Sequence, residues 1–137
     1  MVALVGTALY LHTLRFGFVY DDGVEILNNK LIESLANIPD IFRRSAWSGA
    51  DIEFIHYRPL TTATYALNHA ADGLDPWGYH AVNVALHALA SVLVLHLARL
   101  WGLGRLGSAI AALLFAVHPI HVEAVANIAG RKDRLAT

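Results

Sequence analysis

The sequence predicts an all-α membrane protein, and two observations lead to that prediction. Of its 137 residues, 56% are hydrophobic and 15% are charged, whereas a soluble domain has about 45–50% apolar and about 25% charged residues. Apolar stretches close to the roughly 20 residues that a helix needs to cross the hydrocarbon core occur three times. The net charge of −1 argues against a nucleic-acid partner, and the absence of cysteine excludes disulfides and thiolate metal sites. Membrane lipids are the expected surroundings.

The three predicted membrane helices divide the chain into spans and one long loop. The spans cover about residues 1–20, 78–101 and 106–130, and the turn GLGRLG joins the last two as a tight helical hairpin. The region at about 21–77 is more polar without being low in complexity, so it is expected to be a long helical loop outside the cytoplasm. Counting crossings places the start of this loop and the end of the third span on one face of the membrane.

Two helices are expected within this loop. The pattern LIESLANIPDIF places five apolar residues near one helical face, which predicts one amphipathic helix or two short ones over residues 31–42. Its apolar positions are Leu31, Ile32, Leu35, Ile38 and Phe42. Pro59 is suited to open a second helix, which Gly73 is suited to close.

The basic residues give conflicting signals about orientation. Arg99 and Arg105 flank the hairpin turn, and the positive-inside rule assigns that turn to the cytoplasm. A second basic cluster follows the third span and lies on the opposite face: Arg131, Lys132 and Arg134. Either the topology is inverted, or these cations have a function outside the cytoplasm.

Polar groups crowd the end of the third span. The stretch HPIHVE supplies His118, His121 and Glu123, and Pro119 is expected to bend the chain where these groups begin. One interpretation is a substrate or metal site shared with Asp21, and the metal candidates are then Asp21, His118 and His121. The alternative is a helix that ends at the membrane surface with solvated side chains.

A polar stripe also runs along the second span, where four residues recur at offsets of three, four and four: His80, Asn83, His87 and Ser91. Side chains of this kind form hydrogen bonds between membrane helices. This structural role is favoured over direct contact with a substrate.

The adjacent acids Asp21 and Asp22 follow the first apolar segment directly. A carboxylate at the mouth of an apolar segment is able to accept a proton, with its pKa raised by desolvation or lowered by a nearby cation. The alternative is an acidic cap that begins the loop, because aspartate is a common turn residue.

Several stretches resemble one known family in the same order and with similar gaps. They are FVYDD followed by NN, then YRPLTTATYALNHAADGLDPWGYHAVNVALHAL, then AALLFAVHPIHVEAVANIAGRKD. Together they resemble the transmembrane and tetratricopeptide-repeat proteins related to protein O-mannosyltransferases, which have the C-type glycosyltransferase fold. The resemblance implies a partial C-type bundle, present here as the N-terminal part of a multi-span transferase domain. This part is expected to be inactive alone.

The resemblance also implies an activity and roles for residues. A sugar, classically mannose, passes from a polyprenyl-phosphate donor to serine or threonine hydroxyls of protein acceptors on the extracytoplasmic face. The catalytic acidic motif of the family falls on Asp21 and Asp22. Asp21 is expected to be the general base, and Asp22 to orient the acceptor or hold a cation. Arg131 and Lys132 suit the negative charge that develops on the leaving phosphate, and Arg58 in YRPLT is a second candidate.

Two further expectations follow, and one alternative remains. No cofactor is certain, and a divalent metal ion remains open. The composition, rich in alanine and arginine and poor in lysine, favours the bacterial inner membrane over the endoplasmic reticulum membrane as the location of this multi-pass protein. The alternative function is a non-catalytic membrane scaffold that displays tetratricopeptide repeats, expected downstream, to partner proteins.

Overall fold

The computed structural model describes residues 1–44 and 57–135, and these ranges form helices and turns without a strand. The main helices are α1 (Val2–Tyr10), α3 (Pro59–Asp72), α4 (Pro76–Leu100), α5 (Arg105–Val117), α6 (His121–Ala126) and α7 (Arg131–Leu135). Short helical turns lie between α1 and α3: η1 (Leu11–Arg15), η2 (Gly23–Leu27), η3 (Lys30–Ile32), η4 (Leu35–Asn37) and α2 (Ile38–Ile41). The all-helical prediction is therefore confirmed for the part of the chain described.

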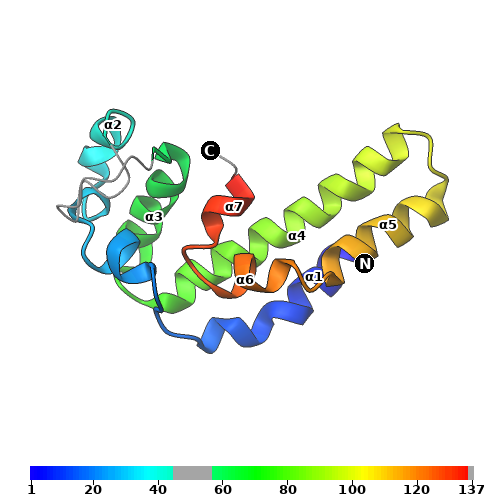
Figure 1. The fold of residues 1–137 in the computed structure, drawn as a ribbon, viewed down its shortest axis with the longest axis horizontal. Coiled ribbons are helices and arrows are strands. Elements are labelled where there is room, and N and C mark those ends of the chain that lie inside the picture. Colours follow the sequence, from blue (N-terminus) through cyan, green and yellow to red (C-terminus); the bar gives the residue numbers. More distant parts are fainter. Residues whose placement is uncertain (45–56, 136–137) are drawn as a thin grey trace.

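Helix α4 is the longest helix and runs obliquely through much of the length of the molecule (Figure 1). Its 25 residues extend about 37 Å at about 1.5 Å per residue, which exceeds the roughly 30 Å of a bilayer's hydrocarbon core. Within the described residues it is the one helix with the length and composition to cross a membrane. Asp75 begins it by accepting a hydrogen bond from the Trp77 amide at 3.0 Å, with Pro76 in the first turn. The second predicted span corresponds to this helix.

The third predicted span is interrupted. Helix α5 has 13 residues and ends at Val117, and α6 begins only at His121. Pro119 explains the break, because it lacks an amide hydrogen and drives the preceding His118 into an extended conformation, with ψ of 129°. The expected bend is confirmed, but the stretch at 106–130 is not one continuous helix.

The first predicted span is also only partly α-helical. Helix α1 ends at Tyr10, the next five residues form a tighter turn, and Phe16 is extended. The Thr13 hydroxyl donates to the Tyr10 carbonyl at 2.7 Å, a local bond that competes with regular helix. A set of three membrane helices in a C-type bundle therefore remains a prediction.

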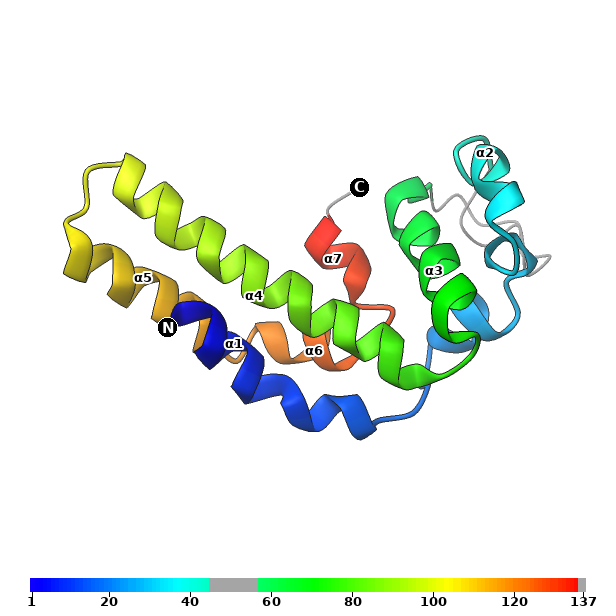
Figure 2. The same ribbon diagram turned by 180° about the vertical axis from the view of Figure 1, so that it is seen from behind.

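Helices α1, α4 and α5 pack together as a bundle (Figures 1 and 2). At Gly6 an added Cβ would lie 3.5 Å from the Ser91 hydroxyl and 3.8 Å from the Ala116 methyl, so small residues let the helices approach closely. His87 is buried and its Nε2 lies 3.0 Å from the Ala116 carbonyl oxygen. The predicted hydrogen-bonding role of the polar stripe on α4 is confirmed for His87.

The region at 31–42 forms the short helical elements η3, η4 and α2, which are closer to the expected alternative of two short helices than to one amphipathic helix. Leu31, Ile32 and Ile41 are buried, whereas Leu35 and Phe42 are exposed, so the expected apolar face is divided. Ser34 has an extended backbone and its hydroxyl accepts a hydrogen bond from the Ala36 amide, which starts a new turn there. The expectation for α3 is confirmed, because Pro59 opens it and Gly73 follows its last residue with φ of 62°.

Helices α6 and α7 bring the C-terminal segment back between the α4–α5 hairpin and α3 (Figures 1 and 2). The turn between them is held by the buried Asn83 side chain on α4, whose Nδ2 donates to the Asn127 carbonyl at 3.0 Å. The same nitrogen lies 3.4 Å from the Ile128 carbonyl oxygen. Asn83 thereby fixes the backbone that leads into α7, beside the acidic loop that follows η1.

Candidate active site

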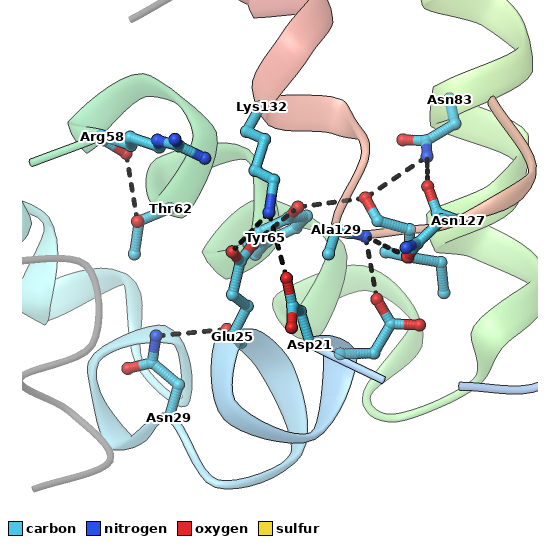
Figure 3. Close-up of polar contacts among 12 residues, drawn as sticks. Asp21, Glu25, Asn29, Arg58, Thr62, Tyr65, Asn83, Asn127, Ala129 and Lys132 are labelled. Carbon is cyan, nitrogen blue, oxygen red and sulfur yellow. Dashed lines mark hydrogen bonds and ion pairs between the residues drawn. The ribbon is translucent and has the colours of Figure 1, made fainter. Parts of the chain in front are cut away.

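The acidic pair and the C-terminal basic pair meet in space, although they lie more than a hundred residues apart in sequence. The Lys132 ammonium lies 3.1 Å from Asp21 Oδ2, across 111 residues (Figure 3). The Asp21 side chain is 51% exposed and that of Lys132 is 22% exposed. An accessible carboxylate beside a cation is what a site for proton transfer on an anionic substrate needs.

A sharp turn presents Asp21. Tyr20, the residue before it, is 92% exposed and has φ of 48°, in the left-handed region that bulky residues rarely adopt. Such a conformation costs of order 1–3 kcal/mol and persists only where surrounding contacts enforce it. The amides of Val24 and Glu25 both donate to the Asp21 carbonyl oxygen, at 3.0 and 2.9 Å, which begins η2 directly after the turn.

Asp22 has a different environment from its neighbour. It is fully buried, and each of its oxygens accepts a backbone hydrogen bond, Oδ2 from Val19 and Oδ1 from Ala129, both at 2.8 Å. Burial raises the pKa of the Asp22 carboxyl, although the two amide bonds act in the opposite direction. Asp22 connects the acidic loop to the segment before α7, which does not fit its predicted role of orienting an acceptor or holding a cation.

We expect removal of the two acids to lower the stability by different amounts. Asp22→Ala removes the side-chain acceptor of the Val19 amide and one of the two acceptors of the buried Ala129 amide, so it should lower the free energy of unfolding by about 1–3 kcal/mol. Asp21→Ala removes one exposed ion pair and should change the same quantity by less than about 1 kcal/mol. Thermal unfolding of both variants in the same detergent tests this, and equal losses would contradict the division between a buried and an exposed acid.

Arg131, predicted to bind the leaving phosphate, is fully buried instead. Its guanidinium donates to Asn83 Oδ1 at 2.8 Å, Asn68 Oδ1 at 2.9 Å, Thr64 Oγ1 at 3.0 Å and the Tyr79 carbonyl at 2.9 Å. It also lies 4.6 Å from the centre of the Tyr65 ring. Burial lowers the pKa of Arg131 to about 10, so it remains a cation near neutral pH. Arg131 therefore ties α7 to α3 and α4 and leaves Lys132 as the accessible cation.

Two site residues were missed by sequence reasoning. The Glu25 side chain is only 7% exposed, and its Oε1 lies 3.7 Å from the Lys132 ammonium. The buried Tyr65 hydroxyl lies 3.3 Å from Glu25 Oε2 and 3.1 Å from the Ile128 carbonyl oxygen. The available signal for Glu25 was its spacing of four residues from Asp21, one helical turn away. Tyr65 had no comparable signal.

The histidines lie in another environment. His118 is exposed and its Nδ1 accepts a hydrogen bond from the Ile120 amide at 3.2 Å. The His121 ring packs 4.3 Å from Phe115 and 5.3 Å from His87, measured between ring centroids, on α5 and α4. Over residues 1–44 and 57–135, no three or more histidine, aspartate or glutamate side chains are grouped to hold a metal ion. The predicted metal candidates are therefore not assembled as a centre in this part of the chain.

Glu123 lies between the acidic loop and the histidines. It lines a groove of about 380 Å³ together with Tyr20, the residue before Asp21, and Asn127, the residue that Asn83 holds. It also lines a second groove of about 670 Å³ beside His121 and the apolar face of α4. Glu123 is exposed, so it is accessible to a ligand in either groove.

Arg58 lies at the start of α3, where its carbonyl oxygen accepts hydrogen bonds from the Thr62 amide and hydroxyl, both at 3.1 Å. Figure 3 shows its side chain on the far side of Tyr65 from Asn83. Among the described residues the guanidinium has no ion-pair partner, and its predicted role in substrate binding remains a prediction.

Comparison with known proteins shows curated relatives that match this chain over nearly all of its length. It is 39% identical, over its whole length, to mouse (Mus musculus) Protein O-mannosyl-transferase TMTC3, covering 15% of that protein. It is 42% identical, over 91% of its length, to Drosophila melanogaster Protein O-mannosyl-transferase Tmtc1, covering 15% of it. It is 42% identical, over 94% of its length, to human (Homo sapiens) Protein O-mannosyl-transferase TMTC2, covering 16% of it.

The chain thus spans about one sixth of the length of the curated relatives it matches. No family model matches it, and no solved structure matches it either.

Proposed function

This chain belongs, by sequence, to the TMTC family of O-mannosyltransferase-like proteins, and from that premise we propose that it forms part of a sugar-transfer site. The sugar, mannose, passes from a polyprenyl-phosphate carrier to a serine or threonine hydroxyl of a protein acceptor. The observation that carries this proposal is the ion pair of Asp21 with Lys132 at 3.1 Å, in which the carboxylate is exposed. It combines a proton acceptor with a cation at one accessible place.

In the proposed reaction the acceptor hydroxyl oxygen attacks the anomeric carbon of the donor sugar. The bond from that carbon to the carrier phosphate oxygen breaks, and the bonding pair leaves with the phosphate. Asp21 takes the hydroxyl proton, which makes the oxygen a better nucleophile. The Lys132 ammonium stabilises the negative charge that develops on the departing phosphate. Asp22 and Arg131 hold the two segments together and make no contact with the substrate.

The groove beside Tyr20 is the proposed place for the sugar. It is lined by Tyr20, which precedes Asp21 in the chain, and the exposed Glu123 and half-buried Asn127 supply polar atoms suited to sugar hydroxyls within an otherwise apolar lining. Helix α4 is long and apolar enough to border a bilayer, from which a lipid-linked donor would approach. We place the site on the extracytoplasmic face of a multi-pass membrane protein.

The test is sugar transfer by the full-length protein carrying Asp21→Asn. A well-placed general base contributes about 10²–10⁴-fold to a rate, so we expect the rate of transfer to fall by at least about 100-fold. Membrane insertion and the unfolding midpoint should not change, because Asp21 is exposed. The matched control is Asp40→Asn, at a partly exposed acid that pairs with Arg44 at 3.5 Å, away from Lys132.

Transfer at the wild-type rate by the Asp21→Asn protein would overturn the catalytic assignment. It would instead support the alternative of a membrane scaffold that binds partner proteins without transferring sugar.

A further inference from the structure

Two carboxylates, and not one, face the Lys132 ammonium. Asp21 and Glu25 lie one helical turn apart, and the Glu25 amide donates to the Asp21 carbonyl oxygen at 2.9 Å. Their distances from the ammonium nitrogen are 3.1 and 3.7 Å (Figure 3). Their accessibility differs sharply, since the Asp21 side chain is 51% exposed and that of Glu25 is 7% exposed. A substrate is thus able to reach the Asp21 carboxylate, whereas the Glu25 carboxylate is almost wholly covered by protein.

Glu25 is held from its other side by α3. The Tyr65 hydroxyl lies 3.3 Å from Glu25 Oε2, and burial together with the Glu25 charge raises the pKa of Tyr65 well above its ordinary value. Tyr65 therefore keeps its proton near neutral pH and shares it, as a donor, between Glu25 and the Ile128 carbonyl oxygen at 3.1 Å. Arg131 lies against the Tyr65 ring, so Glu25, Tyr65 and Arg131 form one connected set behind Lys132.

Lysine needs such support to hold one position. Its ammonium is carried on a flexible four-carbon stem, and a single ion pair with an exposed partner holds it only weakly. Asp21 is exposed and must also exchange protons with an acceptor, so Asp21 alone would hold the Lys132 ammonium only weakly. A second carboxylate that is buried and itself hydrogen-bonded provides a fixed partner for the ammonium.

We propose that Glu25 is a positioning residue that holds the Lys132 ammonium beside Asp21, where the leaving phosphate develops its charge. This inference rests on the proposed sugar transfer. With two carboxylates around one ammonium, the cluster formed by Asp21, Glu25 and Lys132 keeps one negative charge. Asp21 is therefore not fully neutralised by Lys132 and remains able to accept a proton.

The first experiment measures the position of Lys132 without using activity. Lys30 and Lys132 are the only lysines of this chain, so acetylation by acetic anhydride, followed by mass spectrometry of the full-length protein, compares them directly. Glu25→Gln keeps the shape of the side chain and an oxygen for Tyr65 but removes its charge. We expect Lys132 to become acetylated roughly two- to tenfold faster relative to Lys30, because a stabilising ion pair is lost. The matched control, Glu33→Gln at an exposed glutamate, should leave the ratio unchanged.

The second experiment measures transfer by the same full-length variants. We expect Glu25→Gln to lower kcat roughly ten- to a hundredfold, with KM within about twofold, because Lys132 is positioned for the transition state and not for binding. Should Glu25→Gln fail to fold, Tyr65→Phe replaces it, since this change also frees Glu25, and the acetylation ratio should rise in the same direction.

The outcomes separate this inference from the proposed function. An unchanged acetylation ratio in Glu25→Gln overturns the positioning role, whatever the activity. A raised ratio with an unchanged kcat overturns its contribution to transfer. A raised ratio in a protein whose wild type transfers no sugar supports the positioning of Lys132 and refutes the proposed function.

Discussion

Replacing Arg131 with methionine should lower the free energy of unfolding by about 3–5 kcal/mol, the largest loss that we expect from a single substitution here. Methionine fits the volume and avoids the desolvation of a buried charge. It removes, however, a donor from the side-chain oxygens of Asn83, Asn68 and Thr64 and from the Tyr79 carbonyl oxygen, all of which Arg131 contacts within 3.0 Å. Each unsatisfied buried acceptor costs about 1–3 kcal/mol, and some side chains will reorient, so the total is less than the sum.

Two comparisons identify the cause of this loss. Arg131→Lys keeps the charge but replaces a planar fork of donors with a single ammonium group, so it should recover less than half of the lost stability. Arg43→Met changes an exposed arginine in the same way and should shift the free energy by less than about 0.5 kcal/mol. The measurement is thermal unfolding of the three variants in one detergent. Equal stability of Arg131→Met and the wild type would contradict the structural role of this residue.

The sequence predicted those helices whose limits depend on local chemistry. Helix α3 begins at Pro59 and ends before Gly73, and α5 ends where Pro119 forbids a regular helix. The region at 31–42 was different, because its fold depends on which apolar side chains reach the core. Phe42, which the pattern placed on the apolar face, is exposed, whereas Ile41, which it did not, is buried. Tertiary packing decided between them, and periodicity alone does not contain that information.

The members of the candidate site could be named from the sequence, but their contacts could not. Asp21 and Lys132 were named separately, as a base for the acceptor and a cation for the leaving phosphate, and the structure places them 3.1 Å apart. Neighbouring residues of the same charge, however, separated into a buried and an accessible member on both sides, Asp22 from Asp21 and Arg131 from Lys132. Which member is buried depends on the Ala129 amide and on the acceptors of α3 and α4, which lie far away in sequence. The one available signal was that arginine, with its fixed fork of donors, suits burial better than lysine.

Gly130 should tolerate no side chain, since the backbone of α6 lies directly against it. An added Cβ would lie 2.7 Å from the Ala124 Cα and 2.8 Å from the Glu123 carbonyl oxygen. These atoms belong to the backbone and cannot rotate away, unlike the end of a flexible side chain. Gly130→Ala must therefore separate α6 from the segment that leads into α7. Overpacking of this kind costs about 1–3 kcal/mol. Because the obstacle is backbone, we expect the free energy of unfolding to fall by about 3 kcal/mol, the upper end of this range.

The same displacement should disturb the ion pair, which distinguishes Gly130→Ala from a simple loss of packing. Gly130 comes two residues before Lys132, and its carbonyl oxygen accepts from the Asp133 amide at 3.1 Å, so a shift here moves the first turn of α7. We expect a lower unfolding midpoint together with faster acetylation of Lys132 relative to Lys30. Gly23→Ala is the control beside the acidic pair, because a Cβ there meets nothing within 4 Å. If both glycine variants unfolded at the wild-type temperature, Gly130 would not lie against the backbone of α6. The placement of Lys132 beside Asp21, which depends on the same turn, would then be contradicted too.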